Sequence, residues 1–458
     1  MSYSNERPIN FEANIDTLEV IGSIPVQLKG IYVRNGPNPV NNTKYTHLFT
    51  GDGMLHAFYF QNNKVSYANR WVRTKHFYQE VSTNPENVIL KGDLSINISN
   101  VEGVANTNII RHAGFVLALE EAHLPVSIDL KDLSTIEHKA FGTKKTRRMT
   151  AHPKTDTKNG DLYYFGYGTP TSFSNEAIFG IIDNAGNVLA EEEFLMPFPS
   201  MVHDFAITEN YILIPVFPLT ASMERAKNGL PPYAWEPKYG TYLGVMSREK
   251  GVSSLQWYPV ETCFAFHIMN AWENNGAILI DLIEYKEPPL FTNPDGSPLN
   301  PSSNTEGFLS RWVINLKEGE AAVNKSILSE LSGEFPRIDE RRSGIKYNHG
   351  WYCCNKKDAA GNVHHAMGLA HYDLRNNVIN TWYWNEEVQV SEGVFVASSL
   401  NSDEGDGWIL VPVWYAKKNA TELVVFNALE ISQGPLARII LPHRIPDGFH
   451  GNWIPDLT

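Results

Sequence analysis

The sequence is poor in cysteine. Its 458 residues contain three, Cys263 and the neighbours Cys353 and Cys354. Three cysteines cannot make a disulfide framework, and these are not spaced as a CxxC metal pair, so we expect a reduced, cytoplasmic setting. The first residues, MSYSNERPIN, lack the apolar segment of a secretory signal. No apolar run approaches the roughly 18 residues that a membrane-spanning helix needs, so we expect no transmembrane segment.

Positive charge is also scarce. Lysine and arginine number 38 against 51 aspartate and glutamate residues, which gives a net charge of −13. A nucleic-acid partner requires a basic face, so the charge argues against one. The Gly-rich stretch GDGM has no lysine to cradle a phosphate, and no Ser-His-Asp elbow is visible. The sequence therefore does not indicate a nucleotide-binding loop or a serine nucleophile.

Helical periodicity is rare, with residues 219–230, LTASMERAKNGL, as the best candidate. Short runs rich in Val, Ile, Tyr, Phe and Trp recur throughout, among them HAFYF, FVLALEE, DLYYFGYG, YILIPVF, AILIDLIEY, GWILVPVWY and ELVVFNAL. Turn sequences such as NGPNP, KNGD, NAGN and EGDG separate them. Many short strands favour an all-β sandwich, barrel or propeller, and at this length a propeller, because blades add radially. No linker divides the chain, so residues 1–458 are predicted to form a single domain.

Four of the 15 histidines lie in apolar or small-residue surroundings: His152 in MTAHP, His203 in MVHDFAI, His267 in FAFHIMNAW and His450 in GFHGNW. An imidazole in such surroundings needs a polar partner or a ligand. The four are too far apart along the chain for a local metal motif. Only a fold that returns repeatedly to one axis could gather them.

A second histidine cluster competes with these four. The segment VHHAMGLAHYD contains His364, His365 and His371. Strand alternation places His365 and His371 on one face, but their separation is wide and no acidic residue supports them. Spacing alone does not choose between the two sets.

The choice comes from a resemblance to the carotenoid cleavage oxygenase family, which includes lignostilbene and isoeugenol oxygenases. It extends over nearly the whole chain, in the order GIYVRNGPNP (30–39), HLFTGDGMLHAFYF (47–60), ANTN (105–108), LALEEAHLP (117–125), MTAHP, MVHDFAIT, WEPKYGTYLGV (235–245), FHIMNAWE, EFPRID (334–339), SEGVFV (391–396) and GFHGNW. Many ordered motifs make this signal specific. The resemblance implies an all-β, seven-bladed β-propeller with a helical and loop cap over an axial iron site.

The resemblance also implies roles for individual residues. The ligands of one Fe(II) would be His152, His203, His267 and His450. Imidazole suits iron, zinc, copper and nickel alike, and four neutral ligands leave two open positions on an octahedral Fe(II). The family has a second layer of carboxylates, which accept hydrogen bonds from the ligand imidazoles. The residues that match them here are Glu121, Glu334 and Glu392. Thr107 matches a threonine that crowds one open iron position.

The substrate is less clearly indicated. A flat, conjugated molecule would be held by aromatic side chains, and Phe49 and Phe291 match positions that line the family's cleft. The relatives that cleave phenolic stilbenes carry a lysine where this chain has Glu120, and a tyrosine upstream. The upstream segment here, residues 86–100, contains no tyrosine. A glutamate would repel a phenolate but could accept a hydrogen bond from a neutral hydroxyl group.

We therefore expect a non-heme Fe(II) dioxygenase that uses O2 to split a conjugated C=C bond of an apolar substrate into two carbonyl products. The substrate is either an aromatic alkene of the stilbene or phenylpropenoid type or an apocarotenoid. Two alternatives stay open: an iron-dependent ester-cleaving isomerase of the same fold, and a non-catalytic binding propeller. Peripheral membrane contact is compatible with all three.

Overall fold

The structure of the protein is a computed structural model. It describes residues 5–41, 47–83, 85–91, 100–299, 306–316, 323–358, 360 and 363–456. The chain divides into two compact units, which are described separately: a first unit, Met1–Ala140 with Asn348–Thr458, and a second unit, Phe141–Tyr347. The single domain expected from the sequence stays a prediction.

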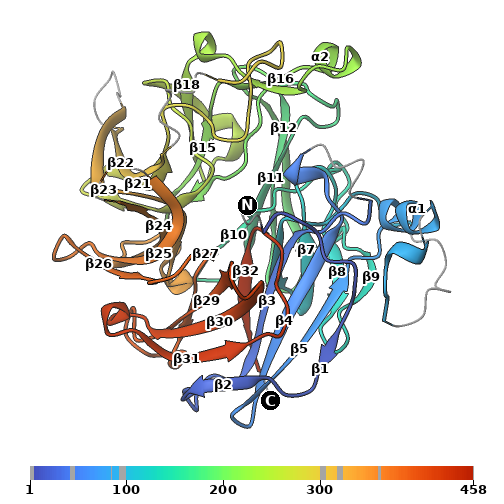
Figure 1. The fold of residues 1–458 in the computed structure, drawn as a ribbon. Helices are drawn as coiled ribbons and strands as arrows, with labels where there is room; N and C mark the ends of the chain where they lie inside the picture. Colours follow the sequence, from blue (N-terminus) through green and yellow to red (C-terminus); the bar gives the residue numbers. More distant parts are fainter. Residues whose placement is uncertain are drawn as a thin grey trace. The chain divides into compact units, whose positions relative to one another are not determined.

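The described part of the first unit contains three antiparallel sheets and a further set of three paired strands (Figure 1). The first has the order β1-β5-β4-β3-β32, with bounds Asn14–Ile15, Lys64–Trp71, Gly53–Gln61, Gly30–Pro37 and Gly451–Pro455. The second is β6-β7-β8-β9, at Asn108–His112, Phe115–Leu119, Val126–Asp129 and Ser134–His138. In the set of three strands, β24 pairs with β25 and β25 with β26, at His349–Lys357, Val363–Asp373 and Val378–Tyr383. The third sheet is β2-β31-β30-β29-β27, with β28 also on β29, at Glu19–Gly22, Pro435–Ile440, Ala420–Asn427, Gly407–Tyr415, Val388–Val390 and Val394–Ala397.

The described residues of the second unit contain two four-stranded sheets, a third set of four paired strands and one hairpin. The first sheet is β10-β11-β12-β13, at Lys154–Thr155, Leu162–Tyr167, Glu176–Ile182 and Val188–Leu195. The second is β14-β15-β18-β19, at Ala206–Ile207, Tyr211–Val216, Thr241–Ser247 and Gln256–Val260. The third comprises β20, β21, β22 and β23, at Ile268–Asn274, Ala277–Glu284, Phe308–Asn315 and Val323–Ile338. The hairpin joins β16, Leu219–Ala221, to β17, Tyr233–Trp235.

Local sequence explains the tight connections. Strands β4 and β5 are joined by Asn62 and Asn63, whose φ angles are 52° and 57°. Strands β20 and β21 are joined by Asn275 and Gly276, at 52° and 84°. Two consecutive residues with positive φ make the turn whose twist suits a hairpin, and Asn and Gly adopt that conformation at least cost. The continuous apolar runs form buried strands, and all nine residues of β29 are buried.

The C-terminal strand completes the first sheet of the first unit. Strand β32 pairs with β3, and Arg34 lies opposite Gly451. The turn before β32 lies close against β3, because a Cβ atom on Gly36 would fall 2.5 Å from the Cα of Gly448. Only glycine permits so close an approach of two backbones. This packing fixes the segment that carries His450.

Two α-helices are present among the described residues. The helix expected at residues 219–230 is only partly correct: the first residues form β16, and α2 spans Met223–Lys227 with Ser222 as its N-cap. Sequence reasoning missed α1, Lys75–Thr83. Its N-terminus is capped by Thr74, which accepts a hydrogen bond from the backbone N–H of Phe77. The helical and loop cap stays a prediction.

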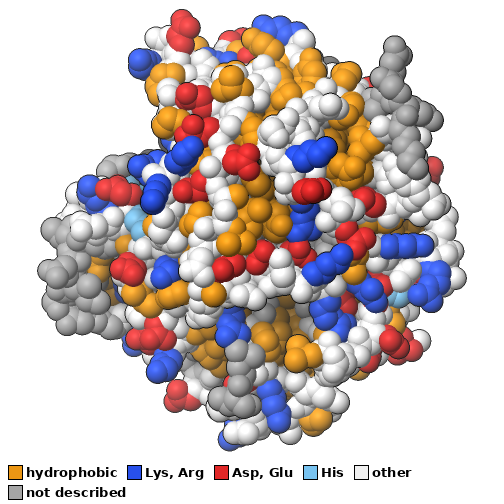
Figure 2. Space-filling model, turned by 180° about the vertical axis from the view of Figure 1, so that it is seen from behind, with side chains coloured by type: hydrophobic (Ala, Val, Ile, Leu, Met, Phe, Trp, Pro, Cys, Tyr) orange, Lys and Arg blue, Asp and Glu red, His pale blue; other side chains and the backbone are white. Residues whose placement is uncertain are grey.

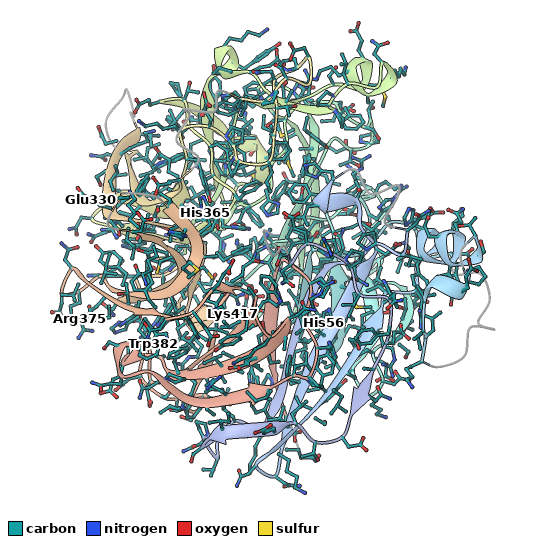
Figure 3. All side chains as sticks on the ribbon, in the orientation of Figure 1. His56, Glu330, His365, Arg375, Trp382 and Lys417 are labelled. Carbon is teal, nitrogen blue, oxygen red and sulfur yellow. The ribbon has the colours of Figure 1, made fainter. Side chains whose placement is uncertain are left out.

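The three histidines of the competing cluster all lie on β25, but in different environments. His364 and His365 are exposed (Figure 3 labels His365), whereas His371 is buried and its Nε2 lies 3.1 Å from Nδ1 of His349. The ring of His371 also stacks on Trp351, with centroids 5.4 Å apart. Neither His365 nor His371 belongs to a group of three or more possible metal-binding side chains among the described residues. The structure therefore gives His371 a packing role and leaves His364 and His365 on the surface.

The buried imidazole of His371 should make the protein sensitive to acid. Burial, followed by the neighbouring His349, lowers the pKa of His371 to about 4. Between that value and the ordinary pKa of 6.5, the unfolded chain binds a proton that the folded chain does not, so stability falls as the pH falls. We expect His371 to cost about 2 kcal/mol of stability between pH 7 and pH 5. Urea unfolding of wild type and His371→Gln at both pH values measures this difference in stability. The same loss of stability in both proteins would contradict the prediction.

The surface mixes charged and apolar side chains. On the face shown in Figure 2, acidic and basic side chains alternate with apolar ones. Large exposed apolar side chains in the second unit include Leu195, Leu230 and Leu290. Among the described residues, no helix has the length and apolar character needed to cross a bilayer. Peripheral membrane contact stays a prediction.

Candidate metal centre

The four histidines singled out in the sequence have the same place in their sheets. His152 lies just before β10, His203 before β14, His267 before β20 and His450 before β32. Each of these strands lies at one end of its sheet. All four side chains are buried. Each of the four histidines therefore lies just before the start of an edge strand.

Three of these imidazoles meet in the second unit. Nε2 of His203 lies 3.0 Å from Nε2 of His152 and 3.2 Å from Nε2 of His267. Possible ligand nitrogens of all three lie within 4.8 Å of one another. A neutral imidazole nitrogen carries either one proton or one lone pair, so these contacts cannot all be good hydrogen bonds. A cation that accepts three lone pairs satisfies the arrangement better.

A carboxylate orients His267. Its Nδ1 lies 2.7 Å from Oε2 of Glu334, a residue of β23. The same oxygen accepts a hydrogen bond from the backbone N–H of Phe335. When Nδ1–H donates to a carboxylate, the proton is fixed on Nδ1 and the Nε2 lone pair is available to a metal. Burial, followed by the charge of Glu334, raises the pKa of Tyr285 well above its ordinary value, so its hydroxyl stays protonated.

His450 has an equivalent arrangement in the first unit. Its Nδ1 lies 2.9 Å from Oε1 of Glu392, and Oε2 of the same carboxylate accepts a 2.9 Å hydrogen bond from the backbone N–H of Gly451. Glu392 is buried. The backbone N–H of His450 donates to the carbonyl oxygen of Thr107, 3.1 Å away. The Thr107 hydroxyl itself donates to Oδ1 of Asn106.

The other two predicted acidic residues differ in their environments. Glu121 lies just beyond β7 and is half-buried. Glu120 is buried, and its Oε1 accepts a 3.1 Å hydrogen bond from the backbone N–H of Val104 and lies 2.8 Å from Nδ1 of His123. The carboxylate of Glu120 is thus already held by the protein. Most of the upstream segment without tyrosine, residues 92–99, lies outside the described residues.

The two predicted pocket phenylalanines lie next to histidine-bearing segments. Phe49 is in the short helix Leu48–Thr50, and its ring centroid lies 5.5 Å from that of Phe449. The ring of Phe291 lies 6.2 Å from that of Phe266. Phe266 in turn contacts His203, with centroids 5.6 Å apart. Aromatic side chains therefore lie beside the histidine-bearing segments in each unit.

Sequence reasoning missed three neighbours of the histidines: Phe266, Phe335 and Asp204. Phe335 stacks on His267 with centroids 5.3 Å apart, and its backbone has a φ of 56°. Its place directly after Glu334 was the available signal. Asp204 directly follows His203 in MVHDFAIT, and nothing in the sequence indicates its partners.

Comparison with known proteins agrees with this geometry. The model of the family described as retinal pigment epithelial membrane protein matches residues 6–455. The isoeugenol monooxygenase of Pseudomonas nitroreducens is 33% identical, over 98% of this chain and 96% of its own. The lignostilbene-α,β-dioxygenase isozyme III of Sphingomonas paucimobilis is 32% identical, over 98% of this chain and 95% of its own.

Solved structures have the same fold. The lignostilbene dioxygenase of Pseudomonas brassicacearum superimposes with a TM-score of 0.89 at 29% identity, over 98% of this chain and 97% of its own. Cobalt-substituted apocarotenoid oxygenase of Synechocystis gives a TM-score of 0.84 at 25% identity, over 99% of this chain and 98% of its own. The all-β, seven-bladed propeller class expected from the sequence is confirmed, and the buried histidines fit the non-heme iron site of that family. The chain therefore belongs to the carotenoid oxygenase family, and its enzyme class is that of the alkene-cleaving dioxygenases.

Proposed function

We propose that His152, His203, His267 and His450 bind one Fe(II) through Nε2. The observation that carries this proposal is the meeting of three buried Nε2 atoms at 3.0 and 3.2 Å. For His450, the support is its position and its orientation. His450 is buried before an edge strand like the others, and the carboxylate on its Nδ1 leaves Nε2 for a metal, as at His267.

The bound Fe(II) would supply the activation of O2 for cleavage of the double bond into two carbonyl groups. The protein residues would orient the ligand imidazoles and balance the charge of the metal. Four neutral imidazoles leave the metal charge uncompensated, and Glu334 and Glu392 provide negative charge one residue layer away. We propose the same role for Glu121 at another imidazole. We also propose that Thr107, whose carbonyl oxygen accepts from the His450 N–H, restricts one open position on the metal.

We propose that the substrate is an aromatic alkene, and that Phe49 and Phe291 contact its rings. The names of the relatives support this choice over an apocarotenoid. Proteins named for isoeugenol and lignostilbene are 33% and 32% identical to this chain, against 28% for a Neurospora crassa carotenoid cleavage oxygenase. Flat conjugated substrates are held mainly by apolar burial and stacking, which the aromatic surroundings of the histidines would provide.

We also propose that the enzyme functions in the cytoplasm. The three cysteines support this, because all are buried thiols rather than halves of disulfides. Unoxidised thiols persist in reducing compartments.

Product analysis tests the proposed reaction. Fe(II)-loaded protein is incubated with O2 and a stilbene, a 4-hydroxystyrene or an apocarotenal, and the products are identified by mass spectrometry. Two carbonyl products and uptake of O2 are expected, with the aromatic alkenes cleaved faster than the apocarotenal. Isomerised or de-esterified products from an ester substrate, without O2 uptake, would favour the isomerase. Binding without turnover of any substrate would favour a non-catalytic propeller.

The charge of Glu120 predicts how a phenolic substrate binds. A carboxylate in a weakly screened site repels a phenolate, so we expect 4-hydroxylated stilbenes to bind as neutral phenols. The cleavage rate should fall as the pH rises through the phenol's pKa, about 10 for an unperturbed phenol. The rate against pH measures it. The 4-methyl ether is the matched control, because it cannot ionise and should not show this decline. A rate that rises as the phenol ionises would contradict the prediction.

A further inference from the structure

A single buried carboxylate contacts all three histidine-bearing segments of the second unit. Asp204 directly follows His203 and is buried, with its side chain 3% exposed. Its Oδ1 accepts a 2.8 Å hydrogen bond from the backbone N–H of Phe205. This hydrogen bond fixes the backbone of the segment that carries His203, just before β14.

The two other contacts of Asp204 reach the neighbouring histidine segments. Oδ2 accepts a 2.9 Å hydrogen bond from the backbone N–H of Ile268, the residue after His267. Oδ1 lies 2.7 Å from Nζ of Lys154, two residues after His152. These contacts of Asp204 are with backbone N–H groups and an ammonium group, not with the imidazoles. Asp204 acts on the backbone and flanking residues that determine where the imidazoles lie.

The chemistry of these contacts requires a carboxylate. All three partners are donors, namely two backbone N–H groups and one ammonium group, and an ionised carboxylate accepts from all of them. Hydrogen bonds to charged groups are stronger than neutral ones, and burial reduces their screening. An asparagine of the same shape would place an NH2 group against at least one donor. Asparagine would also leave the partly buried ammonium group of Lys154 without its counter-charge.

We propose that Asp204 is a positioning residue that holds the segments of His152, His203 and His267 in the arrangement that binds the metal. This inference rests on the proposed metal site. It adds to that site a carboxylate that does not bind an imidazole and whose contacts lie on the strand side of the histidines. Its removal should therefore disturb three ligands at once.

The affinity for Fe(II) tests the proposal, measured by competition with a chelator of known affinity. Asp204→Asn should weaken iron binding by about 10–100-fold, the range found for groups that orient metal ligands. Asp204→Glu keeps the charge and should retain more affinity than Asp204→Asn. Lys154→Met removes one contact of three and should have a smaller effect. The electron paramagnetic resonance spectrum of the nitric oxide complex of the ferrous protein should also change in Asp204→Asn.

Asp281→Asn is the matched control. Asp281 is also a buried carboxylate of the second unit, and it binds Arg311 with two 2.7 Å contacts and accepts from Tyr347. Its loss should lower the thermal stability but leave the iron affinity unchanged. Equal losses of affinity in Asp204→Asn and Asp281→Asn would overturn the proposal, because they would indicate general destabilisation.

Backbone hydrogen exchange of the iron-free protein gives a second measurement that does not depend on the metal. The amides of Phe205 and Ile268 should exchange faster in Asp204→Asn than in wild type. If wild type binds iron and Asp204→Asn binds it equally well, the positioning role is overturned while the proposed metal site stands. Wild type that binds no iron would instead contradict the proposed function.

Discussion

Replacing His267 by alanine should remove the iron from the protein and abolish alkene cleavage. The imidazole of His267 belongs to the group of three Nε2 atoms at 3.0 and 3.2 Å, and its Nδ1 is held by Glu334. Without it, the metal loses one ligand and the carboxylate loses its imidazole partner. Iron content should fall from about one atom per chain to background. Because a metal supplies several kcal/mol of transition-state stabilisation, the rate should fall by about 10³-fold or more.

His371→Ala is the control for this experiment. His371 is also buried, but it stacks on Trp351 and its Nε2 faces His349. Its replacement should lower stability by creating a cavity and leave the iron content unchanged. Metal analysis by mass spectrometry and O2 uptake measure both variants. Undiminished iron in His267→Ala, or equal loss in the two variants, would contradict the assignment of the ligands.

The sequence context of the four histidines marked them as candidates, but it neither chose them over the cluster at residues 364–371 nor brought them together. Each of the four lies among apolar or small residues just before a strand, and these features can be recognised locally. Their meeting depends on contacts between segments far apart in the chain, which no periodicity encodes. The resemblance to a known family supplied that long-range information. It also selected Glu334 and Glu392, whose imidazole partners are 67 and 58 residues away along the chain.

Other features could not be predicted because they depend on close approach in three dimensions. The resemblance marked the position of Glu120, but its pairing with His123 depends on Gly103, where a Cβ atom would lie 1.7 Å from Oε1 of Glu120. Helix α1 was missed because its buried side chains, Phe77 and Val81, make only a short apolar stripe. Asp204 contacts Lys154 and Ile268, which come from strands of two other sheets.

Glu392→Gln should weaken iron binding more than Glu334→Gln does. Glu392 uses both oxygens, one for Nδ1 of His450 and one for the N–H of Gly451. Glutamine has one acceptor oxygen, so its NH2 group would face one of these donors in a buried site. Glu334 uses one oxygen, Oε2, for both His267 and the N–H of Phe335. Glutamine can keep that oxygen in place and lose only the charge.

Both variants should therefore fall within the roughly 10–100-fold loss of affinity typical of partners of metal ligands, with Glu392→Gln near the upper end. Exposure acts in the same direction, because the side chain of Glu392 is 3% exposed and that of Glu334 is 20% exposed. Glu120→Gln is the matched control, since Glu120 is a buried carboxylate paired with a histidine that is not a proposed ligand. Chelator competition measures all three. Iron loss in Glu120→Gln as large as in Glu392→Gln would show that buried charge, rather than contact with a ligand imidazole, controls the affinity.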